Sequence, residues 1–133
     1  MPASSTTSIP PHLQKKFATI KREILGADYD LDASFVSAYQ SRKANKIYRA
    51  KDKPTNVLSF PFDTRAGQII ICPTRAATEA RQLGVSMPDY CCFLFIHGLL
   101  HLKGFDHGAT MERKEQEYCT KCKLKLGNLW HEQ

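Results

Sequence analysis

The sequence lacks any long, uninterrupted run of apolar residues. The longest, from Cys91 to Leu102, is too short to span a bilayer and is interrupted by His97 and His101. We therefore expect no transmembrane helix. The segment from Met1 to Pro10 lacks the basic stretch of a secretory signal, and no continuous apolar segment follows it. These absences exclude membrane-spanning and secreted proteins, so we expect a cytoplasmic protein.

The sequence also lacks a disulfide framework or a zinc knuckle. Cysteine occurs five times, an odd number, and two of the five are adjacent. Cys119 and Cys122 form a C-x-x-C, but no second C-x-x-C accompanies them, and both lie in a charged stretch typical of a helix. We expect reduced, structural thiols, as is usual in a cytoplasmic protein.

Histidines are concentrated in the segment HGLLHLKGFDH, which runs from His97 to His107. Residues four apart share one face of a helix, so His97 and His101 can direct their imidazoles to one point. Gly104 allows the helix to end and the chain to turn back. His107 can then complete a site of three nitrogens with one open position, as catalytic zinc requires. The spacing predicts one Zn²⁺ per chain, whereas the alternative is three unrelated histidines on an apolar helix.

The same segment lacks the glutamate of a metalloprotease. Its spacing matches H-E-x-x-H-x-x-G-x-x-H, but Gly98 occupies the glutamate position. The ligand geometry is kept and the protease base is missing, which disfavours the alternative of a metallopeptidase-like amide hydrolase. Asp106 is expected either to accept a hydrogen bond from a ligand imidazole or to cap the turn after Gly104.

Acidic residues are too few to balance the basic ones, and the formal net charge of +6 favours an anionic partner. The excess is concentrated in six basic residues: Arg42, Lys43, Lys46, Arg49, Lys51 and Lys53. Alone, this cluster indicates a solvated helix face and a charged loop. Next to a hydrolytic metal site, it favours a track for a phosphate backbone. Tyr48 and Phe62 either stack on unpaired bases or pack in the core.

Helical periodicity and helix-end signals predict about five helices. They are expected at residues 13–25, 38–49, 73–83 and 87–102, and from a cap at Thr110 to an end at Gly127. Apolar runs predict strands at residues 31–36, 57–62 and 68–72. The short turn between the last two strands favours an antiparallel pair.

Together these elements predict a small α+β domain with a sheet of three to four strands. The helix that carries the histidines is apolar nearly all round, so it is expected to be central and buried against one face of the sheet. The metal site then lies at its end. We divide the chain into a flexible N-terminal arm, residues 1–10, and a single metal-dependent, ribonuclease-like domain, residues 11–133.

Three segments resemble the YbeY-type ribosomal RNA maturation factors. They are the histidine segment, NKIYRAKDKPTNVLSFPF from Asn45 to Phe62, and GQIIICP from Gly67 to Pro73. The resemblance runs from about Leu31 to Gly127. It implies a mixed sheet and a zinc-dependent, single-strand-specific endoribonuclease that acts on rRNA at the ribosome, in maturation and quality control.

By this resemblance, His97, His101 and His107 are the zinc ligands and Arg49 is a catalytic residue. The expected RNA contacts are Lys46, Tyr48, Lys51 and Lys53. The sequence departs from the family pattern in three respects. Gln68 replaces an aspartate, Ala50 replaces a glycine, and the region before Asp28 shows little of the pattern.

Two mechanisms fit these residues. Either a zinc-activated water attacks the phosphodiester, or the RNA 2′-hydroxyl attacks with zinc as Lewis acid, and in both Arg49 stabilises negative charge. A non-catalytic, zinc-containing ribosome assembly factor is the remaining alternative.

Overall fold

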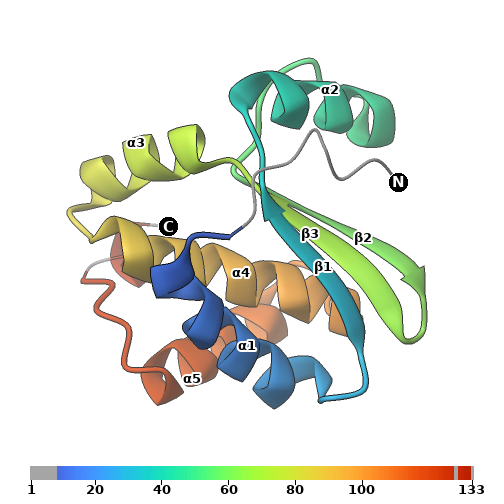
Figure 1. Cartoon of the computed structure of the whole chain (residues 1–133). Helices are drawn as coiled ribbons and strands as arrows, with labels where there is room; N and C mark the ends of the chain where they lie inside the picture. Colours follow the sequence, from blue (N-terminus) through green and yellow to red (C-terminus); the bar gives the residue numbers. More distant parts are fainter. Residues whose placement is uncertain (1–8, 128, 133) are drawn as a thin grey trace.

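Three strands form a single mixed sheet in the order β1-β3-β2 (Figure 1). In the computed structural model, which describes residues 9–127 and 129–132, β1 is Asp30–Phe35, β2 is Val57–Asp63 and β3 is Ala66–Ile71. β2 and β3 form the expected antiparallel hairpin, and β1 joins β3 in parallel. β2 is therefore an edge strand, and its first three residues, Val57, Leu58 and Ser59, line the cleft described below.

The histidine segment lies at the end of the helix on which the core is built. α4 (Met87–Lys103) begins at Ser86, whose side chain accepts a hydrogen bond from the Asp89 backbone N–H at 3.2 Å. It packs on β2 and β3, where Ile69 and Ile71 are completely buried. It ends at Gly104, which has a φ of +112° that favours glycine. The predicted central, buried helix is confirmed.

Three further helices surround α4 on the same side of the sheet (Figure 1). They are α1 (Pro11–Leu25), α3 (Pro73–Leu83) and α5 (Ala109–Lys121). Phe17 of α1 stacks on Phe95 of α4 with ring centroids 4.0 Å apart. The arrangement leaves one face of the sheet buried in the main core.

α2 (Ala38–Arg49) lies on the opposite side of the sheet (Figure 1). Ser37 and Gln40 form the predicted capping box at its start. Between α2 and the sheet, the described residues form a small hydrophobic cluster: Val36, Leu58 and Ile70. At its end, Ala50 adopts a left-handed conformation with φ +57°. Ala50 thus takes the conformation that a glycine would adopt more readily, at a cost of roughly 1 kcal/mol.

The prediction for the last helix is wrong at both ends. α5 begins at Ala109 rather than after a Thr110 cap, and it ends at Lys121 rather than near Gly127. Lys123 takes a left-handed φ of +59°, and the Leu124 N–H donates to the Cys119 carbonyl at 3.0 Å, which closes the helix early. The chain then forms a 3-10 helix, Leu129–Glu132.

The five cysteines are free thiols, as expected. Burial raises the pKa of Cys91 to about 11 and that of Cys92 to about 12. Burial also raises the pKa of Cys119, the first cysteine of the C-x-x-C. These thiols remain protonated at neutral pH, so they act as small core side chains rather than as nucleophiles.

Most of the expected N-terminal arm, residues 1–8, lies outside the described part of the chain. Ile9 is 8% exposed and belongs to the core, and its carbonyl accepts a hydrogen bond from Gln14 Nε2 at 2.8 Å. The boundary at residue 10 stays a prediction. Within the described ranges, no single helix is both long enough and apolar enough to cross a membrane.

Candidate metal centre

The fold brings the three predicted ligand histidines together. One ring nitrogen from each of His97, His101 and His107 lies within 4.8 Å of the others. The Nε2 atoms of His97 and His101 are 3.1 Å apart. Tetrahedral zinc bonded to nitrogen at roughly 2.0–2.1 Å requires ligand atoms about 3.3 Å apart, so this pair has the spacing of two ligands of one ion. The chemistry of the donor set and its geometry therefore fit zinc.

The outer nitrogens of two of these rings are held by other groups. His97 Nδ1 contacts the carboxylate of Glu115 on α5, and His101 Nδ1–H donates to the Phe105 carbonyl at 3.1 Å. Both contacts fix the ring orientation and leave Nε2 free to bind a metal. Burial lowers the pKa of His101, and the neighbouring His97 and His107 lower it further. The neutral imidazole, which is the form that binds a metal, is therefore favoured.

Glu115 was not found from the sequence, although a signal for it exists. It is 6% exposed and lies four residues after Met111 and four before Cys119, on the buried stripe of α5. A carboxylate in an apolar stripe requires a partner, and here the partner is His97. Asp106 is exposed and makes no side-chain hydrogen bond within the described residues, so neither its contact with an imidazole nor its cap of the turn is seen, and Glu115 contacts the His97 imidazole instead.

Replacing Glu115 with glutamine is expected to weaken zinc binding about 10- to 100-fold. Glutamine keeps the size of the side chain but removes the negative charge. That charge orients the His97 ring and makes its imidazole more basic. Competition with a chelating dye measures the affinity. Glu117→Gln is the matched control because Glu117 is an exposed acid on the same helix. Equal affinity in wild type and Glu115→Gln would contradict an orienting role for this carboxylate.

The three histidines lie in a cleft of about 390 Å³ that also contains part of the basic cluster. Arg49, Lys51 and Lys53 line it, as does Arg75 from the start of α3. Four cationic side chains therefore share one hollow with the candidate metal centre. Their positive charge favours an anionic ligand at the metal.

Two of the residues expected to bind RNA do not line this cleft. Lys46 Nζ lies 3.9 Å from the Asp52 carboxylate. Tyr48 packs against Phe60, with ring centroids 4.7 Å apart, in a separate groove. Gln68 lines that groove as well, so its replacement of an aspartate lies away from the histidines. Successive side chains of a helix point in different directions around its axis, so Arg49 faces the cleft and the adjacent Tyr48 does not.

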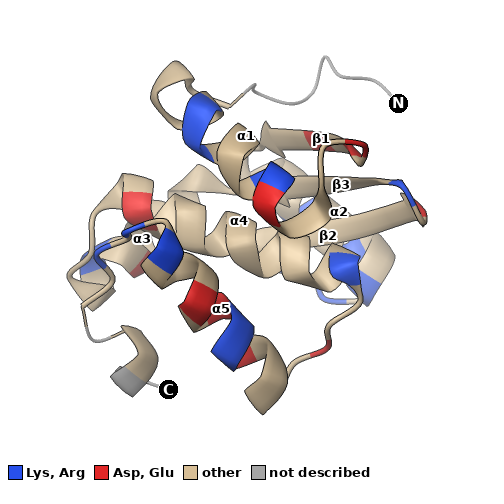
Figure 2. Cartoon of the chain, turned by 90° about the horizontal axis from the view of Figure 1, so that it is seen from below, with Lys and Arg blue, Asp and Glu red and all other residues tan. Residues whose placement is uncertain are grey.

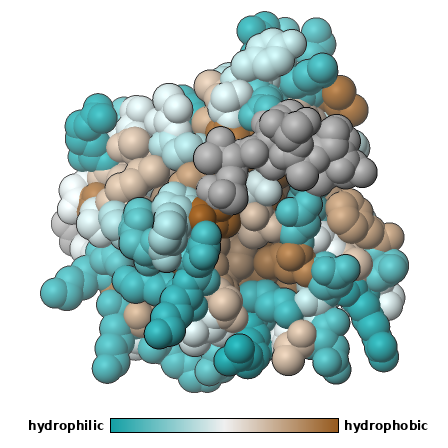
Figure 3. All heavy atoms as spheres, viewed as in Figure 1, coloured by the Kyte–Doolittle hydropathy of each residue, from teal (hydrophilic) through white to brown (hydrophobic). Residues whose placement is uncertain are grey.

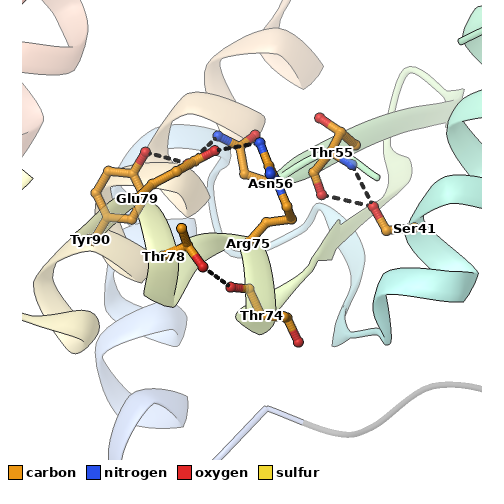
Figure 4. A network of polar contacts seen from close by, with 8 residues as sticks. All are labelled: Ser41, Thr55, Asn56, Thr74, Arg75, Thr78, Glu79 and Tyr90. Carbon is orange, nitrogen blue, oxygen red and sulfur yellow. Dashed lines mark hydrogen bonds and ion pairs between the residues drawn. The ribbon is translucent and has the colours of Figure 1, made fainter. Parts of the chain in front are cut away.

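The loop that carries Lys51 and Lys53 is tied to α2 by two polar side chains. Ser41 Oγ donates to the Thr55 carbonyl at 2.8 Å and accepts from the Thr55 N–H at 2.9 Å (Figure 4). Asn45 Nδ2 donates to the Lys53 carbonyl at 2.9 Å. Both Ser41 and Asn45 are buried. These bonds hold the loop backbone at the rim of the cleft.

A second network, around Glu79, holds the start of β2 and Arg75 (Figure 4). Glu79 Oε1 accepts from Asn56 Nδ2 at 2.8 Å and from the Tyr90 hydroxyl at 2.7 Å. Arg75 Nη2 lies 3.5 Å from Glu79 Oε2. Burial and the Glu79 bond raise the pKa of Tyr90, so its hydroxyl stays a donor. The sequence shows the Arg75 and Glu79 pair only as an ordinary helical i,i+4 pair.

Gly98 lies where α4 approaches β2 and β3 most closely. Its carbonyl accepts a hydrogen bond from Ser59 Oγ at 3.0 Å. A Cβ at this position would lie 2.9 Å from Ser59 Oγ and 3.0 Å from Ile69 Cδ1. A larger side chain at this position would therefore meet side chains of the sheet. The close packing of α4 on β2 and β3 favours glycine here.

Comparison with known proteins gives a consistent result. The family profile described as "Endoribonuclease YbeY" matches residues 4–124. A relative with this name from Mycoplasmopsis synoviae is 36% identical over 113 residues, which cover 77% of this chain and 70% of the relative. A second, from Colwellia psychrerythraea, is 41% identical over 97 residues, covering 68% of this chain and 63% of the relative.

A third relative named "Endoribonuclease YbeY", from Chromohalobacter salexigens, is 40% identical over 96 residues, covering 67% of this chain and 62% of the relative. The chain thus spans less than two thirds of the length of the second and third relatives. Among solved structures, the solution structure of TM1509 from Thermotoga maritima is similar, with a TM-score of 0.65 and 26% identity. The similarity covers 87% of this chain and 86% of that protein.

Proposed function

The chain belongs to the YbeY family of endoribonucleases, and from this premise we propose that it cleaves single-stranded ribosomal RNA with one zinc ion held by its three histidines. Endoribonucleases are hydrolases that break phosphodiester bonds within an RNA strand. One observation carries the proposal: a single cleft holds the three-histidine site and four cationic side chains. A metal site for hydrolysis and a site for phosphate therefore coincide.

In the proposed reaction, His97, His101 and His107 hold the ion, and Glu115 and the Phe105 carbonyl orient two of the rings. A bound zinc ion supplies Lewis acidity, which lowers the pKa of a coordinated water to roughly 7 and polarises a phosphoryl oxygen. The nucleophile is either water or the RNA 2′-hydroxyl. Both routes build negative charge on the phosphate.

Arg49 is the residue placed to stabilise that charge. It is the last residue of α2, and it lines the cleft beside the three histidines. The α2 end is fixed because Asn45, one turn earlier, bonds to the loop that follows. Lys51, Lys53 and Arg75 add positive charge around the phosphates on either side. The volume of about 390 Å³ falls within the range of small-ligand pockets, which suits one nucleotide and its phosphates rather than a duplex.

The family and the free cysteines support the setting that we propose for this reaction. All five cysteines are unpaired, which agrees with a reducing compartment, so we place the enzyme in the cytoplasm. The substrate is rRNA, and the ribosome or its proteins are the partners, as the family resemblance implies. A peptidase is disfavoured because Gly98 packs on the sheet where the peptidase base would lie.

Replacing Arg49 with alanine is expected to lower kcat about 100-fold while leaving the zinc content at one ion per chain. Arg42→Ala is the matched control, because Arg42 lies on the same helix but pairs with Asp52 at 2.6 Å outside the cleft. The measurement is cleavage of one RNA sequence, single-stranded or in a duplex, by zinc-loaded protein. Analysis of the product ends separates the two routes, since a 2′,3′-cyclic phosphate excludes direct water attack. Zinc binding without cleavage of any RNA would contradict the proposal and favour the assembly factor.

A further inference from the structure

Large apolar side chains are exposed on one side of the molecule. Among the described residues, four such side chains are exposed, and all of them lie on α2 or β2: Tyr39, Ile47, Tyr48 and Phe62. Their exposed fractions run from 59% for Phe62 to 72% for Tyr39. Figure 3 shows hydrophobic atoms reaching the surface at the right-hand margin, where these two elements lie. Water-exposed aromatic groups gathered in this way indicate a binding surface.

Part of this surface forms a groove between α2 and the sheet. The groove has a volume of about 520 Å³. We call it the aromatic groove, and its lining includes Tyr48, Phe60, Pro61 and Phe62. Tyr48 and Phe60 are inclined at 54°, and Tyr48 is 68% exposed. The groove thus offers exposed aromatic surface to solvent beside a proline.

The helix that borders the aromatic groove is basic, which favours an anionic occupant. α2 carries four basic residues and no acidic residue. Arg42 and Lys46 lie near Asp52, whereas Lys43 and the cleft residue Arg49 have no acidic partner among the ion pairs of the described residues. By contrast, acidic and basic residues are interspersed along α5 (Figure 2). Exposed aromatic rings next to cations match the two components of single-stranded nucleic acid, the flat bases and the phosphates. An uncharged, apolar protein surface would make no use of these cations.

The aromatic groove lies beside the cleft at the end of α2, where Arg49 lines the cleft and Tyr48 lines the groove. One face of α2 points toward the loop at the cleft and carries Ser41, Asn45 and Arg49, which are four residues apart. The neighbouring face carries Gln40, Ala44 and Tyr48, which line the aromatic groove. Leu58 lines the cleft and also belongs to the small cluster against which Phe60 packs. A strand that leaves the cleft past Arg49 therefore reaches Tyr48 at the end of the same helix.

We propose that the aromatic groove is an RNA subsite, in which unpaired bases next to the cleaved bond stack on Tyr48 and Phe62. This inference rests on the proposed function, because it extends the path of the same RNA strand beyond the cleft. Bases within a duplex are already stacked on each other, so the subsite accepts only unpaired ones. It therefore supplies part of the preference for single strands that the cleft alone does not explain.

The test is a cycle that removes the rings from the protein and the bases from the RNA. The proteins are wild type, Tyr48→Ala/Phe62→Ala and, as the matched control, Tyr39→Ala, each metal-free for the binding titration and zinc-loaded for the cleavage measurement. Tyr39 is also an exposed tyrosine of α2, but it does not line the groove. The probes are a labelled 12-nucleotide single-stranded RNA and the same RNA with abasic sugars on either side of the central nucleotide. Fluorescence anisotropy measures Kd, and a gel confirms that the RNA stays intact during the titration.

The wild type and Tyr39→Ala are expected to bind the complete RNA at least about fivefold more tightly than the abasic RNA, since stacking contributes roughly 1–3 kcal/mol per base. The double variant is expected to bind both RNAs equally. Equal binding of both RNAs by the wild type would overturn the subsite, whether or not the protein cleaves RNA. A double variant that still prefers the complete RNA would also overturn it, and would leave the groove to a protein partner. If the wild type preferred the complete RNA over the abasic RNA but cleaved no RNA, only the proposed function would be overturned.

Discussion

Replacing His101 with alanine is expected to abolish zinc binding and to reduce RNA cleavage to the level of the metal-free wild type. His101 lies next to the other two histidines of the site, with ring centroids 4.7 Å from both His97 and His107. Two remaining imidazoles cannot fill the three protein positions that a catalytic zinc site needs. Zinc content by mass spectrometry of the native protein and cleavage of a single-stranded RNA measure the two losses.

His12→Ala is the matched control, since His12 is an exposed histidine of α1 outside the cleft. It is expected to keep one zinc ion per chain and full cleavage. Denaturant unfolding of both variants without metal is expected to agree within about 1 kcal/mol, because His101 is only partly buried and loses few core contacts. One zinc ion per chain in His101→Ala would place the metal elsewhere in the protein.

The features that were correct from the sequence depend on residues close together in the chain. The convergence of His97 and His101 follows from the helical period, and Gly104 ends the helix so that the chain can bring His107 close to them. The capping box at Ser37 and the β2–β3 hairpin are also local. Local geometry constrains such segments strongly, so their sequence patterns carry most of the information.

The features that were missed depend on contacts between distant segments. Glu115 lies 18 residues after His97, on another helix, and only the packing of α5 against α4 brings the two together. Asn56 meets Glu79 across 23 residues. The parallel pairing of β1 with β3 requires a crossover through α2 and β2, which no local pattern specifies. The basic cluster was one feature in the sequence, but in the fold Arg49, Lys51 and Lys53 line the cleft and the remaining three basic residues of α2 do not.

The second large effect is expected on stability, when Gly98 is replaced with the glutamate of a metalloprotease. The first side-chain carbon alone would lie 2.9 Å from Ser59 Oγ and 3.0 Å from Ile69 Cδ1, so these two side chains must shift, and the rest of the glutamate must then fit between α4 and the sheet. Overpacking of this kind costs roughly 1–3 kcal/mol, and burying a carboxylate without a partner costs several more. The total is a large part of the roughly 5–15 kcal/mol that stabilises a domain, so we expect Gly98→Glu to be largely unfolded.

Circular dichroism and the midpoint of urea unfolding measure this effect, and Gly98→Ala separates its two causes. Alanine adds the same carbon without the charge and gains about 1 kcal/mol of helix propensity, so Gly98→Ala is expected to fold and to lose at most about 2 kcal/mol. Adding Ser59→Ala removes the contacted oxygen, so Gly98→Ala should cost less in that background. A Gly98→Glu protein with the wild-type midpoint would show that α4 can move away from β2 and β3 at little cost. Packing against the sheet would then not explain why residue 98 is glycine. The absence of a peptidase base would need a chemical reason instead.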